Sequence, residues 1–433
     1  MSRRSFLKGA GVVLGGSAFL PVLSKVSEFH TPISFESWTA VRQQFLFDPN
    51  YIHMSQMLLA AHPRMVRDEI QRHRRLFDEN PAEYWENNFM TIENKITESA
   101  AAYMKCAPEE IALTDSTTQG LGILYNGFKL KPGDEILTSI HDHYVTEKSL
   151  AYASAKNGAS IRRMTLYTEP ANASITEIVE TVSKEIRPAT RMIAITWVHS
   201  STGVKLPIKE IGEVIKKANE QRSPKERIYY CVDGVHNFGI GNIDIKELGC
   251  DFFAAGTHKW IFGPRGTGIL YGKKDAWDMV APTFASFTGE PFGMWLGMIP
   301  EGPASFRDLC TPGGFHSFEL RWSLPKAFEF HQQIGKTRVE ERTHHLSSLL
   351  KEGLHQLKSI TLHTPVSPSL SAGINAFEVK GIKPEDVVKK LFAKKIIASS
   401  SPYRVSYARL TPNIANTEEE VKACLKALES LKV

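Results

Sequence analysis

An acid and a lysine follow two neighbouring apolar runs in the middle of the chain. Asp233 ends the run 228–232, and Lys259 comes shortly after the run 251–255. Both runs have the length and composition of buried parallel strands, and the carboxyl ends of adjacent parallel strands open into one crevice. A lysine that forms a Schiff base and an acid that keeps a pyridine ring protonated are the pair that pyridoxal phosphate requires. The sequence therefore predicts a site for this cofactor.

The surroundings of Lys259 favour that interpretation over an ordinary surface lysine. A Schiff base forms from the neutral amine, and a desolvated position near other cations lowers the pKa of a lysine. His258 and Arg265 supply nearby positive or dipolar groups, within the run GTHKWIFGPRGTG at 256–268. A lone lysine in a loop would carry little weight, whereas this run is highly specific.

Alternating strands and helices are expected to position the two residues. After two helices at 63–80 and 91–105, strands are expected at 111–114, 135–139, 160–166, 192–198, 228–232 and 251–255, with helices at 121–128, 147–157, from 176 onward and at 208–219. This alternation predicts an α/β fold, with a mainly parallel sheet covered by helices on both faces.

The pattern changes after residue 283. The segment 283–314 mixes Gly, Pro, Phe, Trp and Met without a period, which is more often functional or interfacial than structureless. A long helix is then expected at 324–357, followed by strands at 360–363, 373–379 and 403–407 and helices at 384–394 and 417–431. We expect an N-terminal arm at 28–60, a large domain at 61–315 and a smaller α+β domain at 316–433.

The motifs around Asp233 and Lys259 resemble those of a known family. CVDGVHNFG at 231–239 and GTHKW with FGPRGTG at 256–268 are similar to the class V (fold type I) aminotransferases, which use pyridoxal phosphate, and more narrowly to the isopenicillin N epimerase-like branch. The resemblance covers nearly the whole chain after the first 27 residues. It implies a large domain with a mainly parallel sheet and a smaller C-terminal α+β domain.

The resemblance assigns residues to the cofactor. Asp233 matches the aspartate that pairs with the pyridine nitrogen through a charge-assisted hydrogen bond, rather than a simple turn cap. His236 matches a position that contacts the ring hydroxyl. The loop 116–120 opens a helix, whose free N–H groups and dipole favour a phosphate, although an N-cap alone would explain its composition equally well. With the family match, the phosphate ligands are Thr117 and Thr118, joined by Thr257 and His258.

The segment 141–144 carries two histidines. The family places a ring at this point, stacked on the pyridine, and His143 fits best, with Tyr144 as the second choice. A zinc site from His141, Asp142 and His143 is the competing interpretation, but no further ligand cluster at convincing spacing supports it. We therefore predict no metal.

The resemblance also assigns residues to the substrate and to a partner. Ser200 and His199 follow the strand 192–198, where relatives touch the cofactor hydroxyl or the substrate. Arg404 matches the arginine that clamps the substrate α-carboxylate with its planar fork; a solvent-facing strand arginine is the alternative. Thr311, in TPGGFH at 311–316, resembles a loop that reaches the partner's phosphate, which implies a homodimer with a shared active site.

The reaction is only partly defined. Cysteine desulfurases of this family carry a thiol shortly before the clamp arginine, and 387–403 contains no cysteine, so that activity is not expected. Removing the Cα proton of an aldimine, with Lys259 as base, leads to transamination, epimerisation or β/γ-elimination, which residue types do not distinguish. A catalytically silent binding protein of the same fold is the alternative from another class, against which the intact Asp233 and Lys259 argue.

The first 27 residues have the composition of an export signal. They carry Arg3, Arg4, Lys8 and Lys25 and no acid, and the paired arginines before Phe-Leu-Lys and a Gly-rich apolar run resemble a twin-arginine (Tat) signal. An uncleaved N-terminal anchor is the alternative. Without the first 27 residues, the chain has 48 basic and 47 acidic residues, a net charge of +1. Neither nucleic acid nor an anionic membrane is thus an expected partner.

Export narrows the expected substrate. Tat export carries folded proteins, which suits an enzyme that acquires its cofactor in the cytoplasm. Exported members of this branch are associated with the maturation of peptide siderophores such as pyoverdine, so we expect a periplasmic enzyme with a small-molecule or short-peptide substrate bearing amino and carboxylate groups. The five cysteines are scattered and fit neither a zinc site nor a dense disulfide framework. No run after Thr31 is long enough to span a bilayer.

Overall fold

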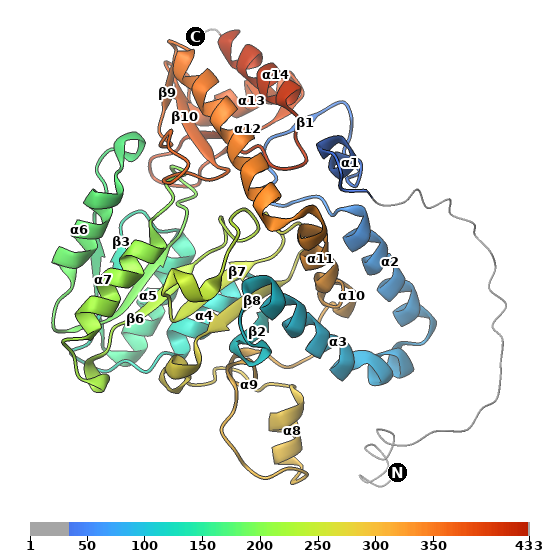
Figure 1. Ribbon diagram of the computed structural model, residues 1–433, viewed down its shortest axis with the longest axis vertical. Coiled ribbons are helices and arrows are strands. Elements are labelled where there is room, and N and C mark those ends of the chain that lie inside the picture. Colours follow the sequence, from blue (N-terminus) through green and yellow to red (C-terminus); the bar gives the residue numbers. More distant parts are fainter. Residues whose placement is uncertain (1–33, 432–433) are drawn as a thin grey trace. The chain divides into compact units, whose positions relative to one another are not determined.

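Seven strands form the main sheet (Figure 1). One of its strands ends at Asp233, and its neighbour ends shortly before Lys259. The computed structural model describes residues 34–431, so the expected export signal lies outside the described residues. The strands are β2 (Ile111–Thr114), β3 (Glu135–Ser139), β4 (Ser160–Met164), β5 (Thr190–Thr196), β6 (Tyr229–Asp233), β7 (Phe252–Gly256) and β8 (Gly268–Gly272). Their order is β2-β8-β7-β6-β5-β3-β4, and only β8 runs antiparallel to its neighbours. The predicted α/β fold with a mainly parallel sheet is confirmed.

Helices cover both faces of this sheet because successive strand residues point to opposite sides. In β6, Tyr230 and Val232 pack in one apolar core and Tyr229 and Cys231 in another. The first core includes residues of α3, α6 and α7, and the second includes residues of α4 and α5. These helices are α3 (Pro81–Met104), α4 (Thr117–Gly127), α5 (Tyr144–Asn157), α6 (Ile175–Glu185) and α7 (Ile208–Asn219).

The aperiodic segment after β8 contains two short helices, α8 (Gly289–Trp295) and α9 (Phe306–Cys310). In Figure 1, α8 lies apart from the sheet, on the loop that joins β8 to α9. The prediction of one continuous helix at 324–357 is wrong. The segment forms two helices, α11 (Leu324–Ile334) and α12 (Lys336–Gln356), which are separated at Gly335 because its φ of +96° is one that residues with a side chain rarely adopt. A short helix, α10 (Phe318–Arg321), precedes them.

A second, four-stranded sheet carries the C-terminal part of the chain. Its antiparallel order is β12-β13-β10-β9, and its strands are β9 (Ile360–Leu362), β10 (Asn375–Val379), β12 (Ser399–Ser400) and β13 (Ala408–Leu410). α12 packs against it in one apolar core together with α13 (Pro384–Ala393) and α14 (Glu418–Glu429). The described residues form one unit, so the predicted boundary at residue 315 stays a prediction.

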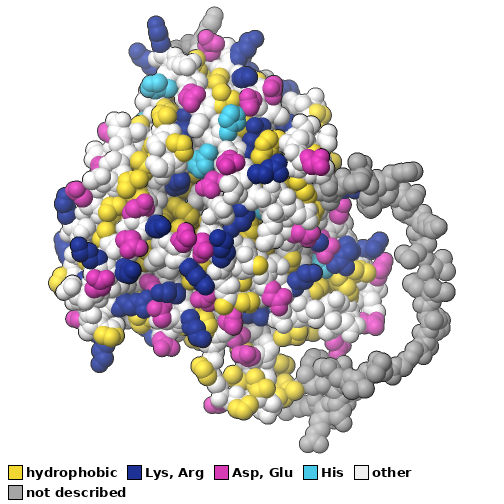
Figure 2. Space-filling view, in the orientation of Figure 1, with side chains coloured by type: hydrophobic (Ala, Val, Ile, Leu, Met, Phe, Trp, Pro, Cys, Tyr) yellow, Lys and Arg dark blue, Asp and Glu magenta, His cyan; other side chains and the backbone are white. Residues whose placement is uncertain are grey.

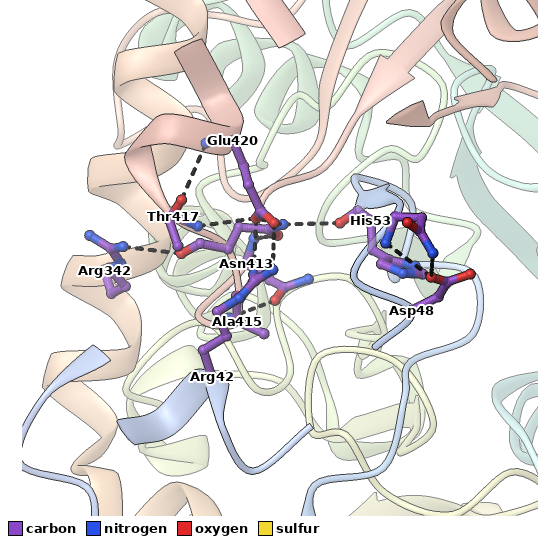
Figure 3. A network of polar contacts seen from close by, with 10 residues as sticks. Arg42, Asp48, His53, Arg342, Asn413, Ala415, Thr417 and Glu420 are labelled. Carbon is purple, nitrogen blue, oxygen red and sulfur yellow. Dashed lines mark hydrogen bonds and ion pairs between the residues drawn. The ribbon is translucent and has the colours of Figure 1, made fainter. Parts of the chain in front are cut away.

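The N-terminal arm is tied to the end of the chain. It holds α1 (Trp38–Arg42) and β1 (Ile52–His53), and α2 (Arg64–Glu79) follows it. β1 pairs in parallel with β11 (Ile396–Ile397). Figure 3 shows the polar contacts that accompany this pairing. The guanidinium of Arg42 contacts both oxygens of Glu420, at 2.6 and 3.1 Å, and donates to the Ala415 carbonyl. Asn416 in turn donates to the His53 carbonyl at 3.1 Å.

Candidate active site

A cavity of about 170 Å³ opens at the carboxyl ends of β5 and β6. Besides these strand ends and the residues that follow them, the lining comes from regions far apart in the sequence: the arm, the start of α4, the start of α5, the lysine loop, Pro402 and β13. The predicted site residues among them are Thr117, Thr118, His143, Ser200, Asp233, His236, His258 and Lys259. The structure therefore brings most of the predicted site together in one place.

Lys259 follows β7 in the loop that carries it into the cavity. Its Nζ lies 3.2 Å from Nε2 of His236, whose Nδ1 accepts a hydrogen bond from the indole N–H of Trp260 at 3.4 Å. Burial lowers the Lys259 pKa to about 8; Asp233 works in the opposite direction, and Arg409 adds to the lowering. A substantial fraction of the amine is therefore neutral near physiological pH, as attack on a carbonyl requires.

Asp233 is the last residue of β6 and is almost fully buried. Its Oδ1 accepts a hydrogen bond from the Val235 N–H at 3.1 Å. Burial raises its pKa to about 6, against the opposing effects of that hydrogen bond and of Lys259. A buried acid of this kind holds a cationic partner strongly, because ion pairing relieves its desolvation. The protonated nitrogen of a pyridine ring is such a partner.

The start of α4 forms the anion-binding end of the cavity. Ser116 caps the helix by accepting from the Gln119 N–H, and Thr117 accepts from the Gly256 N–H at 2.7 Å, which fixes the helix start to the end of β7. A Cβ at Gly256 would lie 2.9 Å from the His258 ring. The unpaired N–H groups of a helix start, with their dipole, suit a phosphate.

His258 lies beside this helix start. Its Nδ1 is buried without a partner among the described residues. Burial, with a smaller contribution from Lys259, lowers its pKa to about 4. The neutral ring offers one N–H to an anion.

His143 caps α5, and this role orients its ring. Nδ1 accepts from the Val145 N–H at 3.3 Å, and the ring edge meets Tyr403 with centroids 5.8 Å apart. Burial lowers the His143 pKa, and Lys259 and Arg409 add to this effect. The alternative, Tyr144, is 64% exposed and does not line the cavity.

Asp142 and His141 make structural contacts rather than a metal site with His143. Asp142 accepts from the Ser139 hydroxyl and from the Thr196 N–H, both at 2.7 Å, which holds the loop between β3 and β5. His141 stacks on Tyr167 with ring centroids 3.9 Å apart. Within residues 34–431 there is no cluster of three or more metal-binding side chains.

The prediction that Arg404 reaches the substrate site is wrong in its placement. Arg404 is exposed in a bend and does not line the cavity, and the strand expected at 403–407 is instead β13, which begins at Ala408. The arginine in the cavity is Arg409, at the centre of β13. Its Nη1 donates to the Ser200 carbonyl at 2.6 Å and its Nη2 to the Ser400 carbonyl at 2.8 Å, while its Nε has no partner among the described residues.

Three further predicted residues lie outside this cavity. Thr257 is fully buried and bonds to the Thr267 hydroxyl within the lysine loop. His199 is buried with its Nδ1 2.8 Å from the Tyr167 hydroxyl. Thr311 accepts from the Leu113 N–H at 3.2 Å and lines a separate small cavity. None of the three residues lines the cavity of Lys259 in its own chain.

Sequence reasoning missed several cavity residues. Met57 and Leu58 come from the arm, Thr196 ends β5, and Pro402 precedes Tyr403. The two arm residues form part of an ordinary apolar run, which carries no chemical signal. Thr196 ends β5 as Asp233 ends β6, since the two are register partners. Aligning the two strands in this register would have identified Thr196 as a cavity residue.

The fold and the site define an enzyme in which a buried lysine and a buried acid face one cavity. The chain matches the family model "Aminotransferase class-V" over residues 62–423, and it belongs to that family. The family and the observed groups agree on the cofactor. The neutral amine, the desolvated acid, the helix start and the orphaned His258 nitrogen fit the carbonyl, ring nitrogen and phosphate of pyridoxal phosphate.

Two curated relatives show the range of activities among similar chains. A probable cysteine desulfurase of Halalkalibacterium halodurans is 28% identical over 340 residues, 75% of this chain and 78% of that protein. An isopenicillin N epimerase of Streptomyces clavuligerus is 25% identical over 410 residues, 91% of this chain and 98% of that protein. The comparisons therefore do not support the predicted exclusion of desulfurase activity.

A solved structure reproduces the fold. A lysine-to-alanine mutant of C-DES, with glycine covalently linked to the PLP cofactor, has a TM-score of 0.81 at 22% identity and covers 90% of this chain and 99% of that one. This likeness bears on the fold alone. The expected fold type I architecture is confirmed.

Proposed function

We propose that this protein is a pyridoxal phosphate enzyme that acts at the Cα of an amino acid, or of an amino-acid residue in a peptidic metabolite, as an aminotransferase or epimerase. The observation that carries the proposal is the convergence of Lys259, Asp233, His143 and Arg409 on one cavity. Each supplies a different requirement of Cα chemistry.

Four residues of the cavity have separate proposed roles. Lys259 would hold the cofactor, and its Nζ would take or return the Cα proton of the substrate. Asp233 would keep the ring nitrogen protonated, and His143 would contact the ring. Arg409 binds the substrate carboxylate. Pyridoxal phosphate, when bound, supplies an electron-withdrawing ring that eases cleavage of bonds at Cα.

The positions of the cysteines support a reaction without a protein thiol. Within the described part of the chain, the residues that line the cavity include no cysteine. Cys231, Cys250, Cys310 and Cys424 are buried and Cys106 is half-buried, and burial raises the pKa of the Cys106 thiol to about 12. A desulfurase that carries sulfur on its own cysteine is therefore disfavoured, despite the curated relatives of that name.

Elimination at the β- or γ-carbon is the second candidate. It starts from the same Cα deprotonation and needs no protein thiol. A relative named L-cysteine desulfhydrase-like protein, from Epichloe uncinata, is 23% identical over 350 residues, which favours retaining this alternative. A silent binding protein is disfavoured because Arg409 adds a carboxylate-binding group to the same cavity as Lys259 and Asp233, which a mere cofactor carrier would not need.

The deciding experiment starts from the purified protein and Lys259→Ala. We expect a visible absorption band from the attached cofactor, which the variant loses. Amino acids and short peptides are then incubated in deuterated water. Deuterium at Cα with the amino group retained indicates an epimerase, a keto acid indicates a transaminase, and a shortened side chain indicates a lyase. A protein with no chromophore and no exchange would contradict the proposal.

A homodimer with a shared active site is part of the proposal. Apolar side chains gather over α8, as Figure 2 shows, and include Phe292, Trp295 and Met298, of which Trp295 is 75% exposed. Apolar surface of this extent is typical of an interface. Sedimentation of the full chain tests the dimer, and mixing Lys259→Ala with Thr311→Val subunits tests whether sites are shared.

Export through the Tat pathway and a role in siderophore maturation remain part of the proposal. The leader motif supports the first, and no helix within the described residues combines the length and apolarity of a membrane span. Fusing residues 1–27 to a folded reporter, with Arg3→Lys and Arg4→Lys as the control, tests export. Loss of transport in the control is the expected result.

A further inference from the structure

Trp260 follows the reactive lysine and contacts the histidine that faces it. Its ring is 3% exposed, and its Nε1–H donates to Nδ1 of His236 at 3.4 Å. The other nitrogen of His236, Nε2, lies 3.2 Å from Nζ of Lys259. His236 thus stands between an indole and the amine that attacks the cofactor.

The chemistry of the indole determines the proton on His236. An indole N–H donates and never accepts, so Nδ1 of His236 must be the acceptor. Burial, with a smaller contribution from Lys259, holds the His236 pKa well below its usual value, so the ring is neutral. Its one proton is therefore on Nε2, the nitrogen that faces Lys259. That N–H can donate to the lone pair of a neutral amine and cannot accept from an ammonium.

We propose that Trp260 is a positioning residue that fixes the tautomer of His236, so that His236 presents Lys259 with a donor and favours the neutral, attacking form of the amine. The inference rests on the cofactor assigned above and not on which reaction follows. Without the indole, the imidazole proton is free to move to Nδ1. Nε2 then becomes an acceptor, which stabilises the ammonium form of Lys259.

The packing around Trp260 keeps the indole in its orientation. A Cβ at Gly373, which precedes β10, would lie 2.3 Å from the indole Cη2. A Cβ at Gly239, in the loop after β6, would lie 2.5 Å from the carbonyl carbon of Trp260. Gly373 therefore allows the close approach of the indole, and Gly239 that of the Trp260 backbone, so that a larger residue at either position would displace Trp260.

Other charged groups act on the same amine. Asp233 favours its ammonium form and Arg409 opposes it, while His143 and His258 face it from the start of α5 and from the lysine loop. Arg409, His143 and His258 also face His236. A change at Trp260 alone leaves all of these groups in place, so its effect on Lys259 is separable from theirs.

The test uses full-length apoenzyme and compares wild type with Trp260→Phe. The acylation rate of Lys259 is measured against pH, with the site identified by mass spectrometry. We expect the midpoint to rise by about one pH unit, which corresponds to exchanging a donor for an acceptor beside the amine. Trp322→Phe is the matched control, because its indole is equally buried and donates to Glu93 at 3.0 Å. Its midpoint should stay at the wild-type value.

Two further measurements sharpen the test, and the first, on the wild-type protein, keeps it decisive if Trp260→Phe folds poorly. Nitrogen NMR of histidine-labelled wild-type apoenzyme reports the tautomer directly, and a proton on Nδ1 of His236 would overturn the proposal. In a His236→Ala background, Trp260→Phe should leave the midpoint unmoved. An equal shift there, or no shift in the folded single variant, would also overturn it. None of these readouts requires turnover, so a failed assignment of the reaction would leave them unaffected.

Discussion

Two arginines in different regions, one half-buried and one fully buried, show how this molecule treats a charge withdrawn from solvent. Arg42, in the arm, contacts both oxygens of Glu420 and donates to the Ala415 carbonyl. Arg409, in the cavity, is 1% exposed and donates only to the Ser200 and Ser400 carbonyls. No carboxylate among the described residues lies within ion-pair distance of Arg409. One arginine is paired within the chain and the other is not.

The difference separates a structural charge from a functional one. Burial of a guanidinium without a carboxylate is costly, and it lowers the Arg409 pKa to about 10. Carbonyl contacts hold the fork in place and leave Nε without a partner. The arm pair ties the N-terminal arm to the end of the chain, whereas Arg409 has no carboxylate partner among the described residues, as its proposed role in binding a substrate carboxylate requires.

The largest expected effect comes from Arg409→Lys. Lysine keeps the charge and loses the planar fork, so kcat/KM should fall about 100-fold or more, mainly through KM for the amino-acid carboxylate. Steady-state kinetics with a carboxylate substrate and its amide measure this. Arg42→Lys is the matched control, with unchanged kinetics. If Arg409→Lys has the wild-type KM for both the carboxylate substrate and its amide, Arg409 does not bind the substrate carboxylate, and the two arginines do not differ in function.

The absence of a carboxylate partner for Arg409 should also appear in the pH dependence of cofactor attachment. The Lys259 pKa is lowered to about 8 by burial, an effect that Arg409 reinforces. The neutral fraction therefore grows with pH below that value, and covalent attachment to apoenzyme should accelerate about tenfold per unit from pH 6 to 8, then level off. Stopped-flow absorbance checks this, with a free alkylamine as the control. A rate that climbs beyond pH 10 would contradict it.

Breaking the arm pair should cost stability and leave catalysis intact. Arg42→Ala removes the contacts to Glu420 and Ala415, although Glu420 retains Asn416 and the Thr417 N–H. We expect unfolding to become easier by about 1–2 kcal/mol, measured by denaturant titration. The kcat/KM of the folded variant should stay within about twofold of wild type.

Arg404→Ala should have the smallest effect. Arg404 is exposed and lies outside the cavity lining, so neither KM nor stability should change by more than about twofold or 0.5 kcal/mol. The same assays as for Arg409 apply. A large rise in KM would return the carboxylate-binding role to Arg404.

The contrast between Arg404 and Arg409 shows where sequence reasoning reached its limit. Asp233 and Lys259 could be placed because each follows an apolar strand whose carboxyl end faces a crevice. Around Arg404, the alternation of Tyr403, Val405 and Tyr407 imitates a strand, while the true strand is the shorter Ala408–Leu410. A three-residue strand is too short for periodicity to identify, and its location depends on pairing with β10 and β12.

Other misses have a similar cause. The antiparallel strand β8 begins and ends with glycine, which leaves only three apolar residues as a local signal, and its place between β2 and β7 comes from tertiary pairing. Met57 and Leu58 enter the cavity through long-range contacts that no local pattern encodes. The parallel strands and most helices of the large sheet, with clear periods and lengths, were predicted to within a few residues, but α3 begins at Pro81 rather than at the expected residue 91.

The pairing of the arm with the end of the chain has a consequence for biosynthesis. Arg42 and Glu420 are 378 positions apart, and β1 finds its partner only at Ile396 and Ile397. The arm is synthesised early, but it can dock only after nearly the entire polypeptide has left the ribosome. Because Met57 and Leu58 reach the cavity through this docking, a nascent or truncated chain that ends before β11 would contain both Asp233 and Lys259 and still lack one wall of its cofactor site.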